Sequence, residues 1–208
     1  MKAMLRILFA GWLLLVALPA FAKPYLELDP PKATEDPGRV EVIEFFWYGC
    51  PHCYRFDPYL EAWRKKQPAD VVFKRQPAIF GPHWAPQARA YFTAEVLGVV
   101  DKIHKDFFDA MHRQKKRMAE EEELAEFFAA HGVDKDTFKN TFHSFMVDMK
   151  MRQAEAMAPE YGITGVPALV VNGKYLITGR TAGGFEDMIK VLDQLVAQER
   201  QKLATAKP

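Results

Sequence analysis

The chain has 208 residues, and its 28 basic and 27 acidic side chains leave a formal net charge of +1 at neutral pH. This near-neutral balance gives no argument for nucleic acid or an anionic membrane surface as a general partner. Two cysteines allow at most one disulfide bond, so a packed core, to which 16 phenylalanines contribute, must stabilise the fold. The length suits one domain with an insertion.

The first 22 residues have the pattern of an export signal. Lys2 and Arg6 precede an apolar run over residues 7–18, and Ala20-Phe21-Ala22 fits the small-x-small cleavage rule. A membrane anchor is the alternative, but the run is shorter than the roughly 20 residues that a spanning helix needs. We therefore predict a secretory signal peptide, cleaved after Ala22, and an exported, soluble protein.

The next segments predict a strand, a helix and a second strand. Residues 40–48 are rich in β-branched and aromatic side chains, as in a buried central strand. Apolar residues recur at helical spacing over 54–66, and residues 71–74 form a second short β-rich run. Residues 25–28 are expected to form an additional edge strand.

The middle of the chain changes to a helical pattern and the end returns to strands. Helices are predicted over residues 88–97, 102–113, 120–130 and 137–158. Strands 168–171 and 174–177 flank Asn172-Gly173, a strong hairpin signal, and residues 184–202 form a last amphipathic helix. The order β-α-β, helical block, β-β-α allows one α/β sheet with the helical block inserted between its halves.

The two cysteines of the chain lie in Cys50-Pro51-His52-Cys53, where the predicted strand over residues 40–48 ends and the following helix begins. A cysteine at a helix N-terminus meets unpaired N–H groups and the positive end of the helix dipole, which favour the thiolate and lower the thiol pKa. Pro51 suits the first helical turn. His52 can add positive charge near the sulfur, and Cys53 lies one turn further on. The pattern favours a disulfide-donating redox pair.

Three other uses of the cysteine pair are weaker. A structural disulfide closing so short a loop would remove little entropy from the unfolded chain. Zinc could use the two thiolates with histidines, but no second CxxC or HxxxH completes a site. Haem attachment requires a histidine directly after the second cysteine, where this chain has Tyr54.

Glu44 is an acid in the otherwise apolar first strand, on the same face as Val42 and Phe46. An unpaired buried carboxylate is costly, so we expect it to be paired, hydrated or raised in pKa. Lys74 in the neighbouring strand is the expected partner. Glu44 could serve as a proton acceptor for Cys53, or it could belong to a structural ion pair or a charged sheet edge; position alone leaves both open.

Glu44-Phe45-Phe46 and Cys50-Pro51-His52-Cys53-Tyr54, followed later by Gly165-Val166-Pro167-Ala168, resemble the DsbA family of periplasmic thiol:disulfide oxidoreductases. The resemblance covers nearly all of residues 23–208. It implies a thioredoxin fold, formed by residues 23–81 and 159–208, with an all-helical subdomain inserted at 82–158.

The same resemblance implies roles for individual residues. Cys50 would be the nucleophile and Cys53 the resolving cysteine, with Glu44 and Lys74 as a buried acid and lysine near them. Val166 and a cis-proline at Pro167 would face the cysteines and pair with an extended substrate. Asp57 stands where relatives often have glutamate.

The resemblance also implies partners. The substrates would be newly exported or unfolded proteins with free thiols, and a quinone-linked membrane protein resembling DsbB would reoxidise the enzyme. We expect a periplasmic monomer with no cofactor beyond the Cys50–Cys53 disulfide, and no metal.

Two rival functions remain. One is a disulfide isomerase or reductase with the same fold, although the short segment between Ala22 and Val40 leaves no room for the dimerisation domain that such isomerases usually carry. The other is a non-catalytic peptide- or metal-binding protein.

Two further features have more than one interpretation. Residues 80–84, Phe-Gly-Pro-His-Trp, could line a hydrophobic groove or form a packed hinge. The histidines of the helical block are expected at surface or helix-capping positions: His104, His112, His131 and His143.

Overall fold

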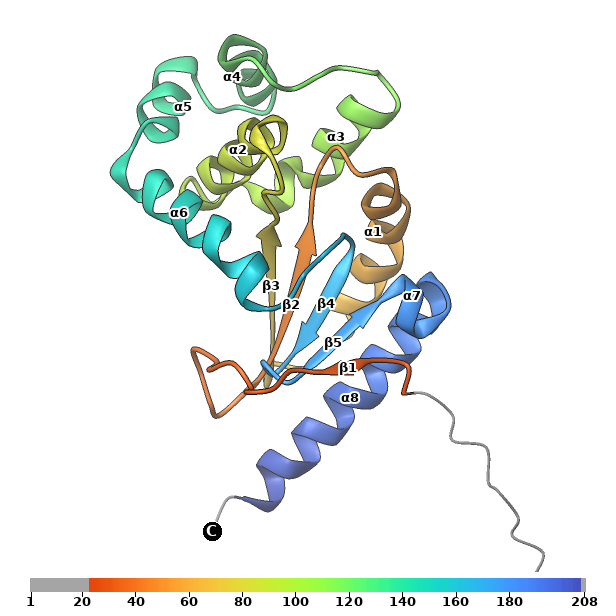
Figure 1. Cartoon of the computed structure of the whole chain (residues 1–208). Helices are drawn as coiled ribbons and strands as arrows, with labels where there is room; N and C mark the ends of the chain where they lie inside the picture. The colour runs from red at the N-terminus through yellow and green to blue at the C-terminus, as the bar shows by residue number, and fades with distance from the viewer. Residues whose placement is uncertain (1–22, 207–208) are drawn as a thin grey trace, which may run out of the picture.

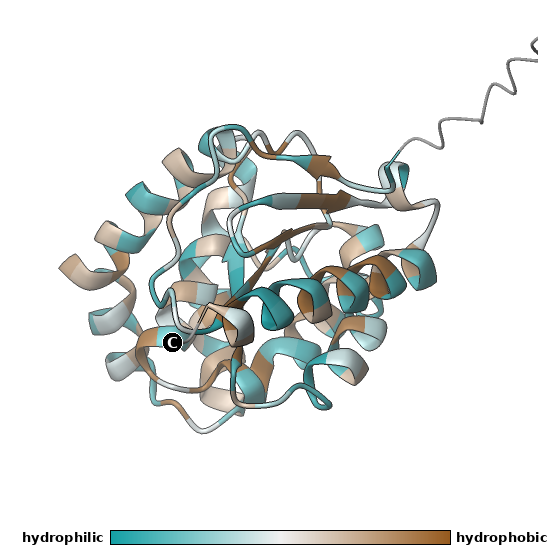
Figure 2. Cartoon of the chain, turned by 90° about the horizontal axis from the view of Figure 1, so that it is seen from below, coloured by the Kyte–Doolittle hydropathy of each residue, from teal (hydrophilic) through white to brown (hydrophobic). Residues whose placement is uncertain are grey.

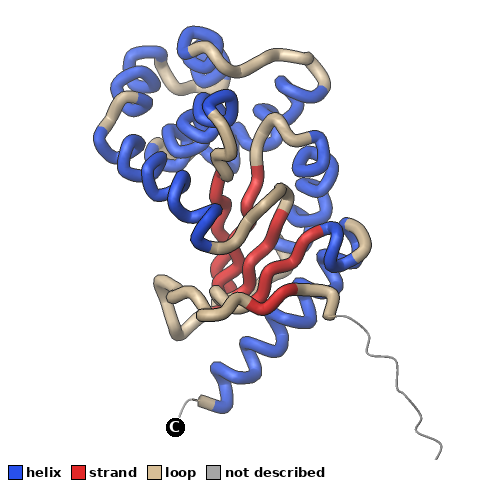
Figure 3. Tube along the Cα trace, in the orientation of Figure 1, coloured by secondary structure: helices blue, strands red, loops and turns tan. Residues whose placement is uncertain are grey.

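The computed structural model describes residues 23–206, so the predicted signal peptide and its cleavage after Ala22 lie outside the described residues. Within this part, a mixed five-stranded sheet lies at one end of the molecule and most of the helices gather at the other (Figure 1). Figure 3 shows the same division, with the strands side by side below the helical end. No helix in residues 23–206 is long and apolar enough to cross a bilayer.

The sheet has the strand order β1-β5-β4-β2-β3. Strand β2 (Val40–Phe46) is buried throughout and pairs in parallel with β3 (Val71–Pro77). Strand β4 (Ala168–Val171) is antiparallel to both β2 and β5 (Tyr175–Thr178), and β1 (Leu26–Glu27) closes the edge beside β5. The expected hairpin and edge strand are both present.

Two helices cover one face of this sheet. Helix α1 (Pro51–Arg64) and helix α8 (Phe185–Thr205) pack apolar side chains against Val42 and Leu169. The opposite face is covered by residues from the end of α6 (Phe145–Glu160) and the segment that follows it. Figure 2 shows brown, apolar residues on the strands and, alternating with teal residues, along the helices that flank the sheet.

The helical block contains five α-helices between β3 and β4. After the 3₁₀ turn Pro82–Trp84 come α2 (Ala85–Val96), α3 (Val100–His112), α4 (Glu121–Ala130), α5 (Lys135–Phe142) and α6. Their apolar core includes Tyr48 and both cysteines, so the block packs directly onto the loop that enters α1.

The prediction of one helix over residues 137–158 was wrong. The chain turns at His143 and Ser144, and the Ser144 hydroxyl caps α6 by accepting a hydrogen bond from the Val147 N–H. A serine at an N-cap satisfies a backbone donor that starts a new helix, which the apolar periodicity does not reveal. The short helix α7 (Gly179–Ala182) was also not predicted.

Candidate active site

Cys50 is the N-cap of α1, and Pro51 occupies the first helical position. The Cys50 backbone is extended, with φ −83° and ψ 116°, and its Sγ accepts a hydrogen bond from the Cys53 N–H at 3.4 Å. Both cysteines are free thiols in this structure and both are buried, Cys53 completely. The strand-to-helix junction therefore places the Cys50 sulfur where the helix leaves its N–H groups unpaired.

This environment separates the two thiols electrostatically. The Cys53 thiol donates a hydrogen bond that lowers the pKa of Cys50 to about 6, against the opposing effect of burial, and the backbone N–H groups of Cys53 and His52 act in the same direction. Burial raises the pKa of Cys53, and the neighbouring Cys50 sulfur raises it further. The environment thus favours a thiolate at Cys50 and a protonated thiol at Cys53.

His52 is exposed beside the sulfur, and its Nδ1 lies 3.0 Å from Nη2 of Arg55. A guanidinium can only donate, so Nδ1 must present a lone pair to it. The Arg55 Nε–H also reaches the Pro51 carbonyl at 3.3 Å. Arg55 was missed by the sequence analysis, although its position three residues after His52 on a helix is the spacing of neighbouring side chains.

The loop before β4 brings a distant segment to Cys50. The Val166–Pro167 peptide bond is cis, and the Val166 carbonyl oxygen lies 3.6 Å from Cys50 Sγ. Because β4 pairs with β2, the two segments meet although they are far apart in sequence. The fold therefore places the Val166 carbonyl directly beside the Cys50 sulfur.

The predicted pairing of Glu44 with Lys74 is wrong, because Glu44 pairs with Arg75. In the parallel register Glu44 lies opposite Arg75 and Ile43 lies opposite Lys74. Strand side chains alternate between faces, so Lys74 points to the other side of the sheet, where it binds Glu41 at 2.6 Å and Glu35 at 2.7 Å. A shift of one residue along β3 separates the prediction from the observed pair.

Arg75 is the centre of a buried charge cluster behind Cys53. Its Nε lies 3.2 Å from Glu44 Oε2, and its Nη2 binds Glu61 and lies 3.6 Å from Asp57. Burial raises the pKa of Glu44 to about 7 despite Arg75, and the charges of Asp57 and Glu61 contribute to the rise. Three carboxyl groups therefore share one guanidinium.

A cavity of about 620 Å³ between α1 and α3 reaches Asp57 and Arg75.

The segment of residues 80–84 packs against the loop before Cys50. The Trp84 ring stacks on Trp47 with centroids 4.1 Å apart, and the Trp47 Nε1–H donates to Gln87. Phe80 remains exposed at the edge of this stack, in contact with Trp84. The geometry favours the packed-hinge interpretation for Trp84.

A pair of cysteines at the start of the first helix of a thioredoxin fold, facing a cis-proline loop, is the arrangement of thiol:disulfide oxidoreductases. Residues 41–194 match the family model of the DSBA-like thioredoxin domain. The chain belongs to this family, and it is a thiol:disulfide oxidoreductase.

Relatives and solved structures agree with this assignment. The chain is 47% identical to a thiol:disulfide interchange protein DsbA of Azotobacter vinelandii over 178 residues, which cover 86% of this chain and 83% of that protein. A crystal structure of Pseudomonas aeruginosa DsbA superposes with a TM-score of 0.83 at 45% identity, covering 89% of this chain and 95% of that one. The crystal structure of DsbA from Xylella fastidiosa superposes with a TM-score of 0.81 at 39% identity, covering 88% of this chain and 99% of that one.

Proposed function

We propose that this enzyme is a periplasmic dithiol oxidase that donates a Cys50–Cys53 disulfide to newly exported proteins. The observation that carries the proposal is the different placement of the two sulfurs: Cys50 Sγ caps α1 and accepts from the Cys53 N–H, whereas Cys53 is completely buried. This placement lowers the pKa of Cys50 to about 6 and raises the pKa of Cys53. Stabilising Cys50 as a thiolate stabilises the reduced enzyme, which makes the disulfide a stronger oxidant.

The catalytic cycle has two exchange steps. A substrate thiolate attacks Cys50 Sγ, the Cys50–Cys53 bond breaks, and Cys53 leaves as a thiolate that takes up a proton. A second substrate thiolate then attacks the substrate sulfur of the mixed disulfide. Cys50 leaves as a thiolate, the substrate holds the new disulfide, and the enzyme has gained two electrons. The disulfide is the only redox group that this cycle needs.

Neighbouring residues support these steps. Pro51 begins α1, the His52 backbone N–H helps to stabilise the Cys50 thiolate, and Arg55 beside the His52 ring supplies positive charge. Glu44, held by Arg75, donates the proton that Cys53 takes up in the first step and is the proton acceptor for Cys53 when the enzyme is reoxidised, because its pKa of about 7 allows it to release or gain a proton near neutral pH. Lys74 has no direct part, since it lies on the opposite face of the sheet.

The cis-proline loop is the proposed substrate-binding element. The Val166 carbonyl points to Cys50 Sγ, so an extended chain that pairs with the backbone at Val166 and Pro167 would bring its cysteine to the reactive sulfur. The substrates are unfolded exported proteins with free thiols. A DsbB-like, quinone-linked membrane protein removes the two electrons afterwards. The signal-peptide pattern of residues 1–22 supports the periplasmic location.

Two linked measurements test the direction of electron flow. The Cys50 thiolate is titrated by its ultraviolet absorbance in wild-type and Cys53→Ser protein, and the wild-type enzyme is equilibrated with glutathione. We expect an acidic Cys50 and a potential more oxidising than the value of about −270 mV for thioredoxin. An ordinary thiol pKa with a potential at or below that of thioredoxin would instead favour the reductase function. Zinc retained by reduced protein but lost in Cys50→Ser would favour metal binding.

A further inference from the structure

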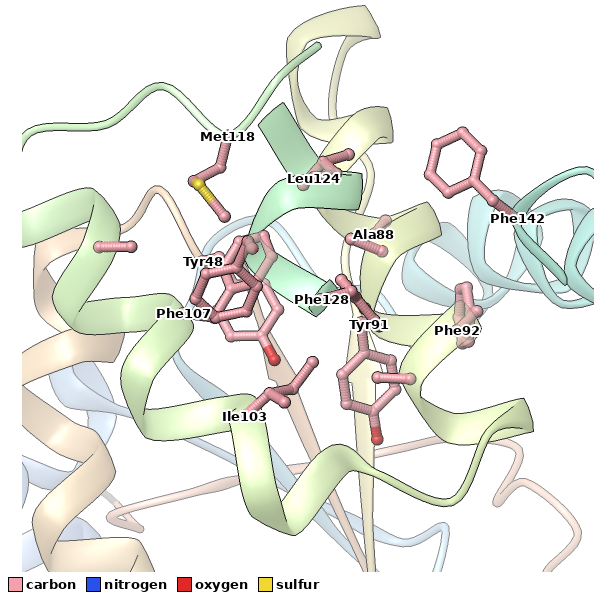
Figure 4. Close-up of a cluster of buried hydrophobic side chains, with 14 of the residues drawn as sticks. Tyr48, Ala88, Tyr91, Phe92, Ile103, Phe107, Met118, Leu124, Phe128 and Phe142 are labelled. Carbon is pink, nitrogen blue, oxygen red and sulfur yellow. The ribbon is translucent and has the colours of Figure 1, made fainter. Parts of the chain in front are cut away.

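Tyr48 lies two residues before Cys50, and two histidines of α3 hold its polar atoms. The Tyr48 hydroxyl is 2.8 Å from His104 Nδ1, and the Tyr48 backbone carbonyl is 2.7 Å from His112 Nε2. The Tyr48 ring stacks on Phe107 of the same helix with centroids 4.2 Å apart, a contact visible in Figure 4. The exposed fractions are 2% for Tyr48 and 4% for His104.

These contacts correct the expected surface or capping positions of His104 and His112. His104 is buried, and its Nε2 lies 3.2 Å from Asp57 Oδ1. A carboxylate only accepts, so Nε2 carries the hydrogen and Nδ1 accepts from the Tyr48 hydroxyl. Burial lowers the pKa of His104 to about 4, with the charge of Arg75 acting in the same direction. The ring is therefore neutral near pH 7, with both nitrogens paired.

His112 has a second contact on the other side of the cysteines. Its ring stacks on Tyr54, with centroids 4.8 Å apart and an interplanar angle of 8°. The Tyr54 hydroxyl donates to Asp109 of α3 at 2.7 Å. Helix α3 thus binds the residue directly after Cys53 as well as the loop before Cys50.

The Tyr48 carbonyl belongs to the turn that delivers Cys50 to the helix. In this turn the Cys50 N–H donates to the Trp47 carbonyl at 3.0 Å, and the Cys50 sulfur then accepts from the first turn of α1. Within this turn, His112 donates to the Tyr48 carbonyl. A shift of this turn would move the sulfur relative to the N–H groups that stabilise its thiolate.

We propose that His104 and His112 are positioning residues that hold Tyr48 by its hydroxyl and its carbonyl and so keep the Cys50 sulfur at the N-terminus of α1. The inference rests on the proposed function, because it concerns the same sulfur. In this arrangement the helical block packs against the active-site loop and also tunes the redox potential of the cysteine pair in the thioredoxin-like part.

The redox potential of the enzyme distinguishes a residue that positions the Cys50 thiolate from one that only stabilises the fold. A residue that only stabilises the fold contributes equally to the oxidised and the reduced protein, so its loss lowers both stabilities and leaves the potential unchanged. A residue that positions the thiolate contributes more to the reduced protein, so its loss makes the enzyme less oxidising. The readouts are the glutathione equilibrium, the Cys50 thiolate titration, and the thermal stability of both redox forms.

The main variant is His112→Phe, which keeps a ring for Tyr54 and removes the donor to Tyr48. We expect the equilibrium constant with glutathione to shift about two- to tenfold towards the oxidised enzyme, which is the effect of losing one hydrogen bond; a tenfold shift corresponds to about 30 mV. The Cys50 pKa should rise in parallel. His112→Gln, whose amide can donate to the same carbonyl, should restore part of both values.

His131→Phe is the matched control. The His131 Nδ1 also hydrogen-bonds a backbone carbonyl, that of Phe127 at 2.7 Å, at the end of α4 rather than beside the cysteines. This variant should change stability without changing the potential. Tyr48→Phe provides a second test if His112→Phe folds poorly, because it deletes only the hydroxyl held by His104, and it should shift the potential in the same direction.

The proposal is overturned if the folded variants keep the wild-type potential and thiolate titration while both redox forms lose stability equally. Failure of the proposed function gives a different result, because the wild-type enzyme itself would then have an ordinary Cys50 pKa and a reducing potential. The positioning proposal is judged only on the difference between each variant and the wild type.

Discussion

Glu44 and Arg75 face each other across the parallel strands β2 and β3, with Arg75 Nε 3.2 Å from Glu44 Oε2 and side-chain exposures of 1% and 4%. A buried ion pair of this kind is costly to desolvate and gives little net stability. Burial raises the pKa of Glu44 more than the charge of Arg75 lowers it, and the nearby carboxylates Asp57 and Glu61, which also lie beside Arg75, add to the rise. The pair is thus better suited to exchanging a proton near neutral pH than to stabilising the fold.

Glu44→Gln should flatten the pH dependence of stability of the reduced protein. The folded-state pKa of about 7 lies above the ordinary value of 4.5, so the folded protein holds a proton that the unfolded chain releases between these values. The stability contribution is therefore present below about pH 4.5 and is lost as pH rises through 7, by an amount on the order of 3 kcal/mol. Urea unfolding at stepped pH measures it.

The matched control is Glu41→Gln, which removes a paired carboxylate from the opposite face of the same strand. This variant should retain the decline in the free energy of unfolding that the wild-type protein shows between pH 4.5 and 7. If Glu44→Gln retains the decline as well, another group titrates in this range.

Arg55→Met should raise the Cys50 pKa by less than about one unit, because an exposed charge is screened by water and salt. The guanidinium lies 3.0 Å from His52 and adds positive charge to the first turn of α1. Thiolate absorbance titration measures the change, and the difference should shrink in high salt. Lys66→Met removes the same charge just beyond the far end of α1 and should have no effect. Identical thiolate titrations for the two variants would show that Arg55 does not affect the Cys50 pKa.

Gly173→Ala should destabilise the protein by about 2 kcal/mol or more. Gly173 has φ +64°, and a Cβ there would lie 2.1 Å from the Lys32 carbonyl oxygen. That carbonyl belongs to the N-terminal segment that crosses the β4–β5 hairpin, where the Lys32 N–H donates to Gly173. Gly162→Ala is the control, since Gly162 has φ +65° with open space around it and should cost only about 1 kcal/mol. Equal losses in urea unfolding would show that the close approach does not matter.

Glu199→Gln should remove an acid-sensitive part of the stability. Burial alone would raise the pKa of Glu199, but hydrogen bonds from Lys174, Lys202 and Asn172 lower it to about 2. Since the folded pKa lies below the ordinary value of 4.5, the contribution is present above pH 4.5 and is lost as pH falls towards 2. Thermal unfolding between pH 2 and 6 should show a shallower slope for the variant, and a slope equal to the wild type would contradict the assignment.

Local patterns in the sequence were enough to locate the redox pair and most of the framework around it. The alternating and apolar runs predicted β2, β4 and β5, and Asn172-Gly173 predicted the hairpin, because these signals act over a few neighbouring residues. The same is true of Cys50 at the start of α1, since the change from strand to helix period marks that junction.

Only the tertiary structure decided which groups surround the sulfurs. The β2–β3 register selects Arg75 over Lys74 for Glu44, because a shift of one residue moves a side chain to the other face. The packing of α3 brings His104 and His112 to Tyr48, which no spacing along the chain indicates. Contacts between distant segments depend on how the elements assemble, so the sequence by itself determined the reactive pair and its helix, and the assembled fold decided the partners that set its chemistry.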